Sequence, residues 1–176
     1  STFSKSNASY LDETEIFVER LAMVEGWISA NRPGENIANV CAELNLNAYC
    51  CGVDDRIWED LMIPWYASAM RHLLISGSEG EMFFVGTDKG WPGYGLFLGT
   101  GTDAGMRSPA FFAKRLFAAA AGQGSELVQT DVSGTSGMVE ALALYAMGGR
   151  SHILLIHKSP ATTSDAEPRL ISSKAR

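Results

Sequence analysis

The sequence predicts an α/β protein in which alternating helices and strands are followed by an antiparallel β layer. Apolar residues recur at helical spacing in three segments, and two short segments between them are apolar on successive residues, as buried strands are. The last third instead combines β-forming segments with a Gly-Gly pair, which is typical of a hairpin. Alternation of helix and strand indicates βα units built on a parallel sheet.

The first helix is predicted between Asp12 and Asn31. Asp12 can cap it, and Leu11 can pack against Ile16 across the first turn. The segment 31–34, Asn-Arg-Pro-Gly, ends the pattern. One face of this helix is apolar and consists of Phe17, Leu21, Val24 and Ile28.

Two strands are predicted at residues 37–46 and 82–85. Their apolar residues are consecutive rather than alternating, as in 40–42, which indicates parallel strands covered on both faces. The helix between them begins near residues 54–55, and Pro64 must kink or restart it. Its apolar stripe consists of Trp58, Leu61, Met62, Trp65, Ala69 and Leu73.

A glycine-rich loop is predicted after the second strand, because residues 86–105 contain seven glycines. The next helix starts at Pro109, with Ser108 as its cap, and runs to about Ala121. Gly122 then stands where a left-handed C-terminal cap belongs.

The C-terminal third is predicted to be antiparallel sheet, and Gly148-Gly149 joins its last two strands. These strands are predicted at residues 127–132, 138–147 and 151–158. The polar, unpatterned end of the chain predicts a disordered tail. The predicted domains are an α/β part at residues 1–122, β strands at 123–160 and the tail at 161–176.

Composition argues against several function classes. The chain has 14 basic and 20 acidic side chains, a net charge of 14 − 20 = −6, and no dense basic cluster, so nucleic acid is not an expected partner. No apolar segment approaches the about 20 residues that cross a bilayer, so no membrane partner is expected. The three cysteines and three histidines show no metal-ligand spacing. We therefore predict neither a metal nor a cofactor.

Glu43 is the main candidate for a catalytic residue, because it follows the apolar residues of the first predicted strand. Burying an unpaired carboxylate costs several kcal/mol, so this position needs a reason. In (β/α) barrels, side chains at the carboxyl ends of strands line the active site. Asn45 and Asn47 would lie at the same mouth if the strand continues. Alternatively the strand ends at Ala42, and Glu43 is solvated or paired with Arg32.

Residues 39–45, Asn-Val-Cys-Ala-Glu-Leu-Asn, resemble the seventh strand of the retaining clan A glycoside hydrolases, where a "TE-x-N" type sequence carries the catalytic nucleophile. The eighth strand, its loop, the last barrel helix and the C-terminal β-sandwich of that family are matched in order by residues 82–85, 93–97, 108–117 and 139–160. The resemblance covers about residues 12–160. It implies the last βα units of a TIM-type barrel, a partial barrel, followed by antiparallel β-sandwich strands.

This resemblance implies a retaining mechanism, in which one carboxylate attacks the anomeric carbon and a second donates and then removes a proton. Glu43 would be the nucleophile. The family's second carboxylate follows an asparagine at the end of the fourth strand, and nothing upstream of Glu43 matches it. A full barrel needs about 250 residues. We therefore expect a fragment or truncated relative that is inactive alone and requires the missing N-terminal barrel units.

The implied substrate is a carbohydrate, and the residues expected to bind it are Asn45, Asn47, Trp91 and Tyr94. The family places a tryptophan under the sugar at the end of the eighth strand, whereas this chain has Val85 and Gly86 there. Trp91 could replace that tryptophan from the loop, because aromatic rings form flat apolar platforms for ligands. Alternatively, Trp91, Tyr94 and Phe97 pack the loop onto the top of the barrel.

Other functions compete with this one. The segment 99–104 matches the G-x-G-x-x-A turn that binds dinucleotides, but the predicted helix starts several residues too late to point its N-terminus at a pyrophosphate. Cys41 or Cys50 could form a nucleophilic pair with His72, although a core position is expected for Cys41. A barrel remnant could also bind carbohydrate without cleaving it, or only stabilise a partner.

Overall fold

The computed structural model of the chain describes residues 6–46, 55–88, 93–122, 124–130, 132, 138–146 and 148–159. Its helices are α1 (Asn7–Asp12), η1 (Glu13–Glu15), α2 (Ile16–Asn31), η2 (Asp55–Trp58), α3 (Met62–Ile75) and α4 (Pro109–Ala120). Its strands are β1 (Val40–Leu44), β2 (Gly80–Phe83), β3 (Thr87–Asp88), β4 (Phe97–Leu98), β5 (Glu126–Val128), β6 (Val139–Ala146) and β7 (Arg150–His157). The protein is thus mixed α/β. The predicted tail at 161–176 lies outside the described residues.

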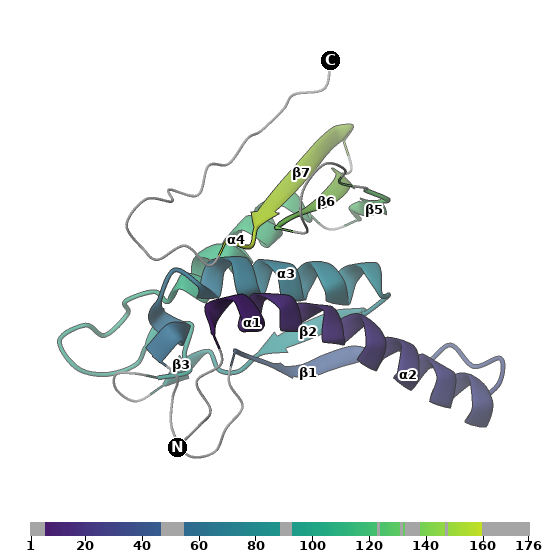
Figure 1. Cartoon of the computed structure of the whole chain (residues 1–176), viewed down its shortest axis with the longest axis horizontal. Coiled ribbons are helices and arrows are strands. Elements are labelled where there is room, and N and C mark those ends of the chain that lie inside the picture. The colour runs from purple at the N-terminus through teal and green to yellow at the C-terminus, as the bar shows by residue number, and fades with distance from the viewer. Residues whose placement is uncertain are drawn as a thin grey trace.

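The strands form three small sheets. β1 and β2 pair in parallel, β3 and β4 form a second parallel pair inside the glycine-rich segment, and β5, β6 and β7 form an antiparallel sheet in that order. Helix α3 lies between the β1–β2 sheet and the β5–β6–β7 sheet (Figure 1). Across the described ranges these sheets do not close into a barrel.

Two apolar cores hold these layers together. The larger core joins α1, β1 and α3, and its fully buried members include Leu11, Ile57, Met62 and Tyr66. The smaller core joins α4 to the antiparallel sheet and consists of Phe117, Ala120, Leu142, Leu144 and Leu154. Side chains of α3 contact both cores, so this helix connects the parallel sheet to the β layer.

The N-terminal helix begins earlier than predicted. Ser6 caps α1 by accepting a hydrogen bond from the Ser9 amide at 3.2 Å, whereas Asp12 makes no side-chain capping bond. The predicted packing of Leu11 against Ile16 does not define the helix start either. Leu11 is buried in the core, whereas Ile16 is exposed to solvent. The predicted end at Asn31 is confirmed.

The boundaries of the other helices show where local signals were sufficient. The segment predicted as one helix from residues 54–55 is divided into η2 and α3, and Pro64 lies in the first turn of α3, where a missing N–H costs no intrahelical bond. The predicted restart near Pro64 is therefore confirmed. Ser108 caps α4 and Pro109 begins it, as predicted. Gly122 does not have a positive φ, and the prediction of a left-handed cap there is wrong.

The β layer matches the sequence prediction closely. β6 and β7 pair over their whole length, from Val139 with His157 to Ala146 with Arg150. Gly148 and Gly149 both have positive φ, at 105° and 80°, which is the backbone that a tight hairpin turn needs and that only glycine adopts without strain.

The β1–β2 sheet differs from the prediction in its burial. Both strands were expected to be covered on two faces, but the described helices cover one face only. Val40, Met82 and Phe84 point away from those helices and are 43%, 60% and 44% exposed. The prediction was wrong here because consecutive apolar residues do not reveal whether the second covering layer is present.

Gly95 permits a close approach between the chain segments around β3 and β4. A Cβ atom at this position would lie 2.5 Å from the Phe97 carbonyl oxygen and 2.9 Å from the Asp88 amide nitrogen. Both contacts are with main-chain atoms, which can move aside only if the backbone shifts. Glycine is therefore required at this position by packing.

We predict that Gly95→Ala lowers the free energy of unfolding by about 2 kcal/mol, because the added methyl group overpacks against main chain. Gly86→Ala is the matched control, since a Cβ there meets nothing within 4 Å. Urea titration of both variants checks this. Equal stability of the two would contradict the close approach.

Candidate functional site

An extra residue in β1 determines which way Glu43 points. Cys41 pairs with Glu81 of β2. Three residues later Leu44 pairs with Phe83, which is only two residues after Glu81, so the register shifts between these pairs. Strict alternation from Cys41 would point Glu43 toward the helices, but a bulge turns the following side chains over. Leu44 is accordingly buried, and Glu43 is exposed.

The alternative in which the strand ends at Ala42 is correct only in part. Glu43 is solvent-exposed, but β1 continues to Leu44, and the ion pair of Glu43 with Arg32 is absent. Arg32 instead forms a bidentate pair with Glu35, at 2.8 and 2.7 Å. Among the described residues Glu43 has no ion-pair partner. Its side chain therefore lies on the face of the β1–β2 sheet that the described helices leave open.

Phe84 is a candidate that the sequence analysis missed. Its backbone amide donates to the Leu44 carbonyl at 3.1 Å, so Phe84 directly neighbours the end of β1. Phe83 points toward the helices and packs edge-on against Tyr66, with ring centroids 5.5 Å apart. Phe84 consequently lies on the opposite face, together with Glu43, and its ring centroid is 6.0 Å from that of Tyr94.

The sequence contains a signal that could have identified Phe84. The strand-end position of the family's tryptophan falls on Val85 and Gly86, directly after Phe84. Since Phe83 is half-buried and alternate residues face opposite ways in a strand, Met82 and Phe84 share a face. An aromatic residue therefore does follow β2 next to the end of β1.

Asn45 connects the end of β1 to the segments that follow β2. Its side-chain amide donates to the carbonyls of Phe84 and Tyr94, the latter at 3.2 Å. Its Oδ1 accepts from the Leu46 amide at 2.7 Å. Both amide hydrogens are thus engaged with main-chain carbonyls, and the residue fixes the geometry around Glu43.

Of the other residues predicted to bind substrate, only Tyr94 lies within the described residues. Tyr94 is half-buried and packs against the larger core, and its amide donates to the Asp88 carboxylate at 2.9 Å. This contact agrees with the alternative in which Tyr94 packs the loop. Asn47 and Trp91 lie outside the described residues.

A second polar cluster lies on the helix side of the same sheet. The Glu81 carboxylate, whose side chain is 4% exposed, accepts hydrogen bonds from Tyr66 of α3 and from Lys114 of α4. Burial and the bond to Glu81 raise the pKa of Tyr66, so its hydroxyl stays a neutral donor. The cluster fastens both helices to β2.

The environment of Cys41 argues against a nucleophilic thiol. Burial raises the pKa of Cys41, and the nearby Glu81 carboxylate acts in the same direction. His72, its proposed partner, is engaged with Glu140 instead, at 3.2 Å. Cys50 lies outside the described residues.

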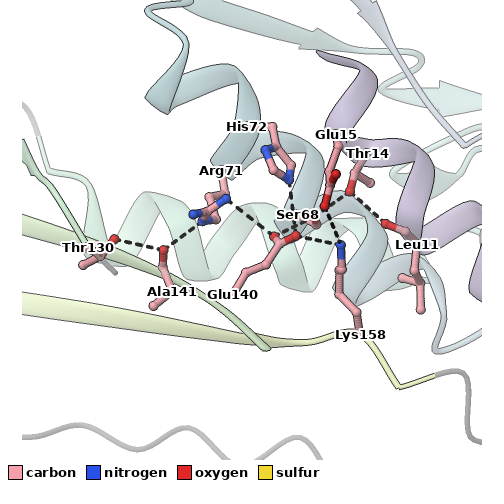
Figure 2. Close-up of polar contacts among 10 residues, drawn as sticks. All are labelled: Leu11, Thr14, Glu15, Ser68, Arg71, His72, Thr130, Glu140, Ala141 and Lys158. Carbon is pink, nitrogen blue, oxygen red and sulfur yellow. Dashed lines mark hydrogen bonds and ion pairs between the residues drawn. The ribbon is translucent and has the colours of Figure 1, made fainter. Parts of the chain in front are cut away.

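Glu140 is the centre of a buried network between the β layer and α3 (Figure 2). This carboxylate projects inward from β6 and accepts hydrogen bonds from Ser68 at 2.7 Å, His72 at 3.2 Å and Lys158 at 2.8 Å. Ser68 also bonds to Thr14 of η1 at 2.7 Å. The network thus joins α3, η1, β6 and the residue that follows β7.

The electrostatics of this network favour ionised Glu140. Burial alone would raise the pKa of Glu140, but hydrogen bonds from His72, Lys158 and Ser68 outweigh it and lower the pKa to about 2. Sequence analysis missed the network. The available signal was a single carboxylate in the otherwise apolar segment 139–146.

A polar pocket of about 380 Å³ lies at the other end of the β1–β2 sheet. It is lined by the end of α2, the segment that leads into β1, and the turn before β2, and includes Glu25, Arg32, Asn39 and Glu79. Because β1 runs from Val40 to Leu44, this pocket is at its amino end and Glu43 is near its carboxyl end.

Two further properties bear on the site. Within the described ranges, no cluster of three or more histidine, cysteine or acidic side chains could hold a metal ion. No helix of the described chain is long and apolar enough to cross a bilayer.

The chain matches no protein-family model and no curated protein.

We predict that Glu140→Gln lowers the free energy of unfolding at pH 7 by about 3 kcal/mol, because it leaves the buried Lys158 ammonium with only the more distant and exposed Glu15 carboxylate, at 3.9 Å. Since the pKa of Glu140 falls from 4.5 to about 2 on folding, its stabilisation is complete above pH 4.5 and is lost as the pH falls toward 2. Urea titrations from pH 7 to pH 2.5 should therefore show a smaller decline for the variant. Glu59→Gln, at an exposed position, is the control. Parallel curves for wild type and Glu140→Gln would contradict the network's role.

Proposed function

We propose that the chain is the C-terminal part of a retaining glycoside hydrolase that cleaves glycosidic bonds by double displacement, with Glu43 as the nucleophile. The bulge in β1 is the observation that supports this most. It turns one carboxylate away from the helices at the carboxyl end of a parallel strand, where barrel enzymes place catalytic groups.

The proposed chemistry assigns distinct tasks to the residues at this strand end. The Glu43 carboxylate attacks the anomeric carbon and forms a bond to it, while the glycosidic oxygen leaves with its electron pair. Phe84 provides an apolar face for the sugar ring beside the nucleophile. Asn45 acts as a positioning residue, since it bonds the main chain on both sides of the site.

The second catalytic carboxylate would come from the missing N-terminal barrel units. The uncovered apolar face of β1–β2 supports this, because parallel sheets are normally buried on both faces. The β layer would correspond to strands of the C-terminal β-sandwich. On this account the finer architecture is a partial TIM-type barrel followed by sandwich strands, and the carbohydrate binds only to the completed barrel.

A non-catalytic remnant that binds carbohydrate, or only stabilises a partner, is the second candidate. It is favoured by the hydrogen bonds of Asn45, which are made to main-chain carbonyls. The two candidates differ in whether Glu43 forms a covalent bond to sugar.

We predict covalent labelling of Glu43 by dinitrophenyl β-glycosides that carry fluorine beside the anomeric carbon. Dinitrophenolate leaves without a proton, so the missing acid is not needed for this step, and the fluorine slows release of the sugar. Mass spectrometry of the digested full chain, after addition of any polypeptide encoded upstream in the same reading frame, should find the sugar on the peptide that contains Glu43. The full chain alone should carry little or no label.

Glu43→Gln should abolish labelling. Glu79→Gln, which removes an exposed carboxylate at the amino end of the sheet, should leave it unchanged. A sugar attached elsewhere, or no labelling in either preparation, would exclude Glu43 as the nucleophile and favour the non-catalytic candidate.

A further inference from the structure

Helix α2 has more apolar surface than the rest of the protein covers. Its inward stripe is the predicted one, in which Leu21 is buried and the other members are half-buried, namely Phe17, Val24 and Ile28. Only Leu21 among the 16 residues of α2 is buried. The helix extends past the ends of β1 and β2 (Figure 1), which leaves much of it uncovered.

A second stripe, Ile16–Arg20–Met23–Trp27, runs along an uncovered side of α2. Spacings of four, three and four residues place these side chains on one face of the helix. Ile16, Met23 and Trp27 are 42%, 40% and 59% exposed, and Arg20 is exposed between them. Contiguous exposed apolar residues of this kind mark interaction surfaces.

We propose that the second stripe is the docking face for an amphipathic helix that carries a carboxylate opposite Arg20. This inference rests on the proposed function, because the missing barrel units would supply that helix. Apolar side chains three and four residues apart are the pattern that helix-in-groove recognition uses. Arg20 has no ion-pair partner in the described part of the chain, and an acidic residue on the incoming helix would complement it.

Charge also argues against a second copy of this chain as the occupant. The second stripe has one cation and no anion, so stripe-on-stripe contact between two copies supplies no carboxylate for either Arg20 and, when the helices run parallel, brings the two arginines together. Like charges placed opposite each other disfavour association. A partner helix of opposite charge has no such penalty.

The test uses two synthetic helical peptides with identical leucine stripes, one flanked by glutamate and the other by lysine. Binding to the full chain is measured by fluorescence anisotropy of the labelled peptides and by protection of tryptophan emission from acrylamide. We expect the glutamate peptide to bind about fivefold more tightly than the lysine peptide. Arg20→Glu should reverse this preference.

Met23→Glu should abolish binding of both peptides, and Val18→Glu is the matched control. Val18 is also an exposed apolar residue of α2, but it lies on the opposite side of the helix from the second stripe. Binding that survives Met23→Glu, a preference that Arg20→Glu does not change, or self-association through the stripe would each overturn the proposal. Failure of the nucleophile assignment would be recognised separately, because it changes the sugar labelling of Glu43 and leaves peptide binding to α2 unchanged.

Discussion

The register of β1 against β2 is the constraint on which the account of the site depends. Cys41 and Leu44 both face the helices, and Leu44 is buried in the larger core. A strand that places two residues three apart on the same face must contain an extra residue between them. Glu43 therefore cannot join the core without moving Leu44 out of it. Packing of an apolar side chain thus keeps a carboxylate exposed, with Asn45 holding the strand end in place.

The two polar clusters stabilise different contacts of the same helix. Through Tyr66, α3 is fastened to β2 beneath Glu43. On the other side of α3, Ser68 and His72 fasten it to Glu140 of the β layer. Since buried carboxylates are tolerated only when they are hydrogen-bonded, both clusters specify how the layers meet as well as contributing stability. Exposed apolar residues lie on the β1–β2 face, on α2 and on the β5–β6–β7 sheet, where Ile153 and Leu155 are 45% and 51% exposed.

Local patterns predicted the parts of the structure that depend on local physics. The end of α2 at Asn31, the Ser108 cap and the Gly-Gly hairpin all follow from residues within a few positions. The bulge at Glu43 could not be predicted, because it depends on pairing with a strand about forty residues away. The Glu140 network was missed for the same reason, since its members come from four separate elements. Phe84 could have been predicted, because alternation along the strand from Phe83 gives the face on which it lies.

The most direct test of the central claim is a structure of the chain assembled with the N-terminal barrel units that the proposed function requires. The account predicts that Glu43 faces the interior of a closed barrel, with its carboxylate about 5 to 5.5 Å from a second carboxylate at another strand end. A Glu43 side chain on the outside of that assembly would contradict the account. So would a nearest opposing carboxylate more than about 6.5 Å away, which is the spacing of inverting enzymes.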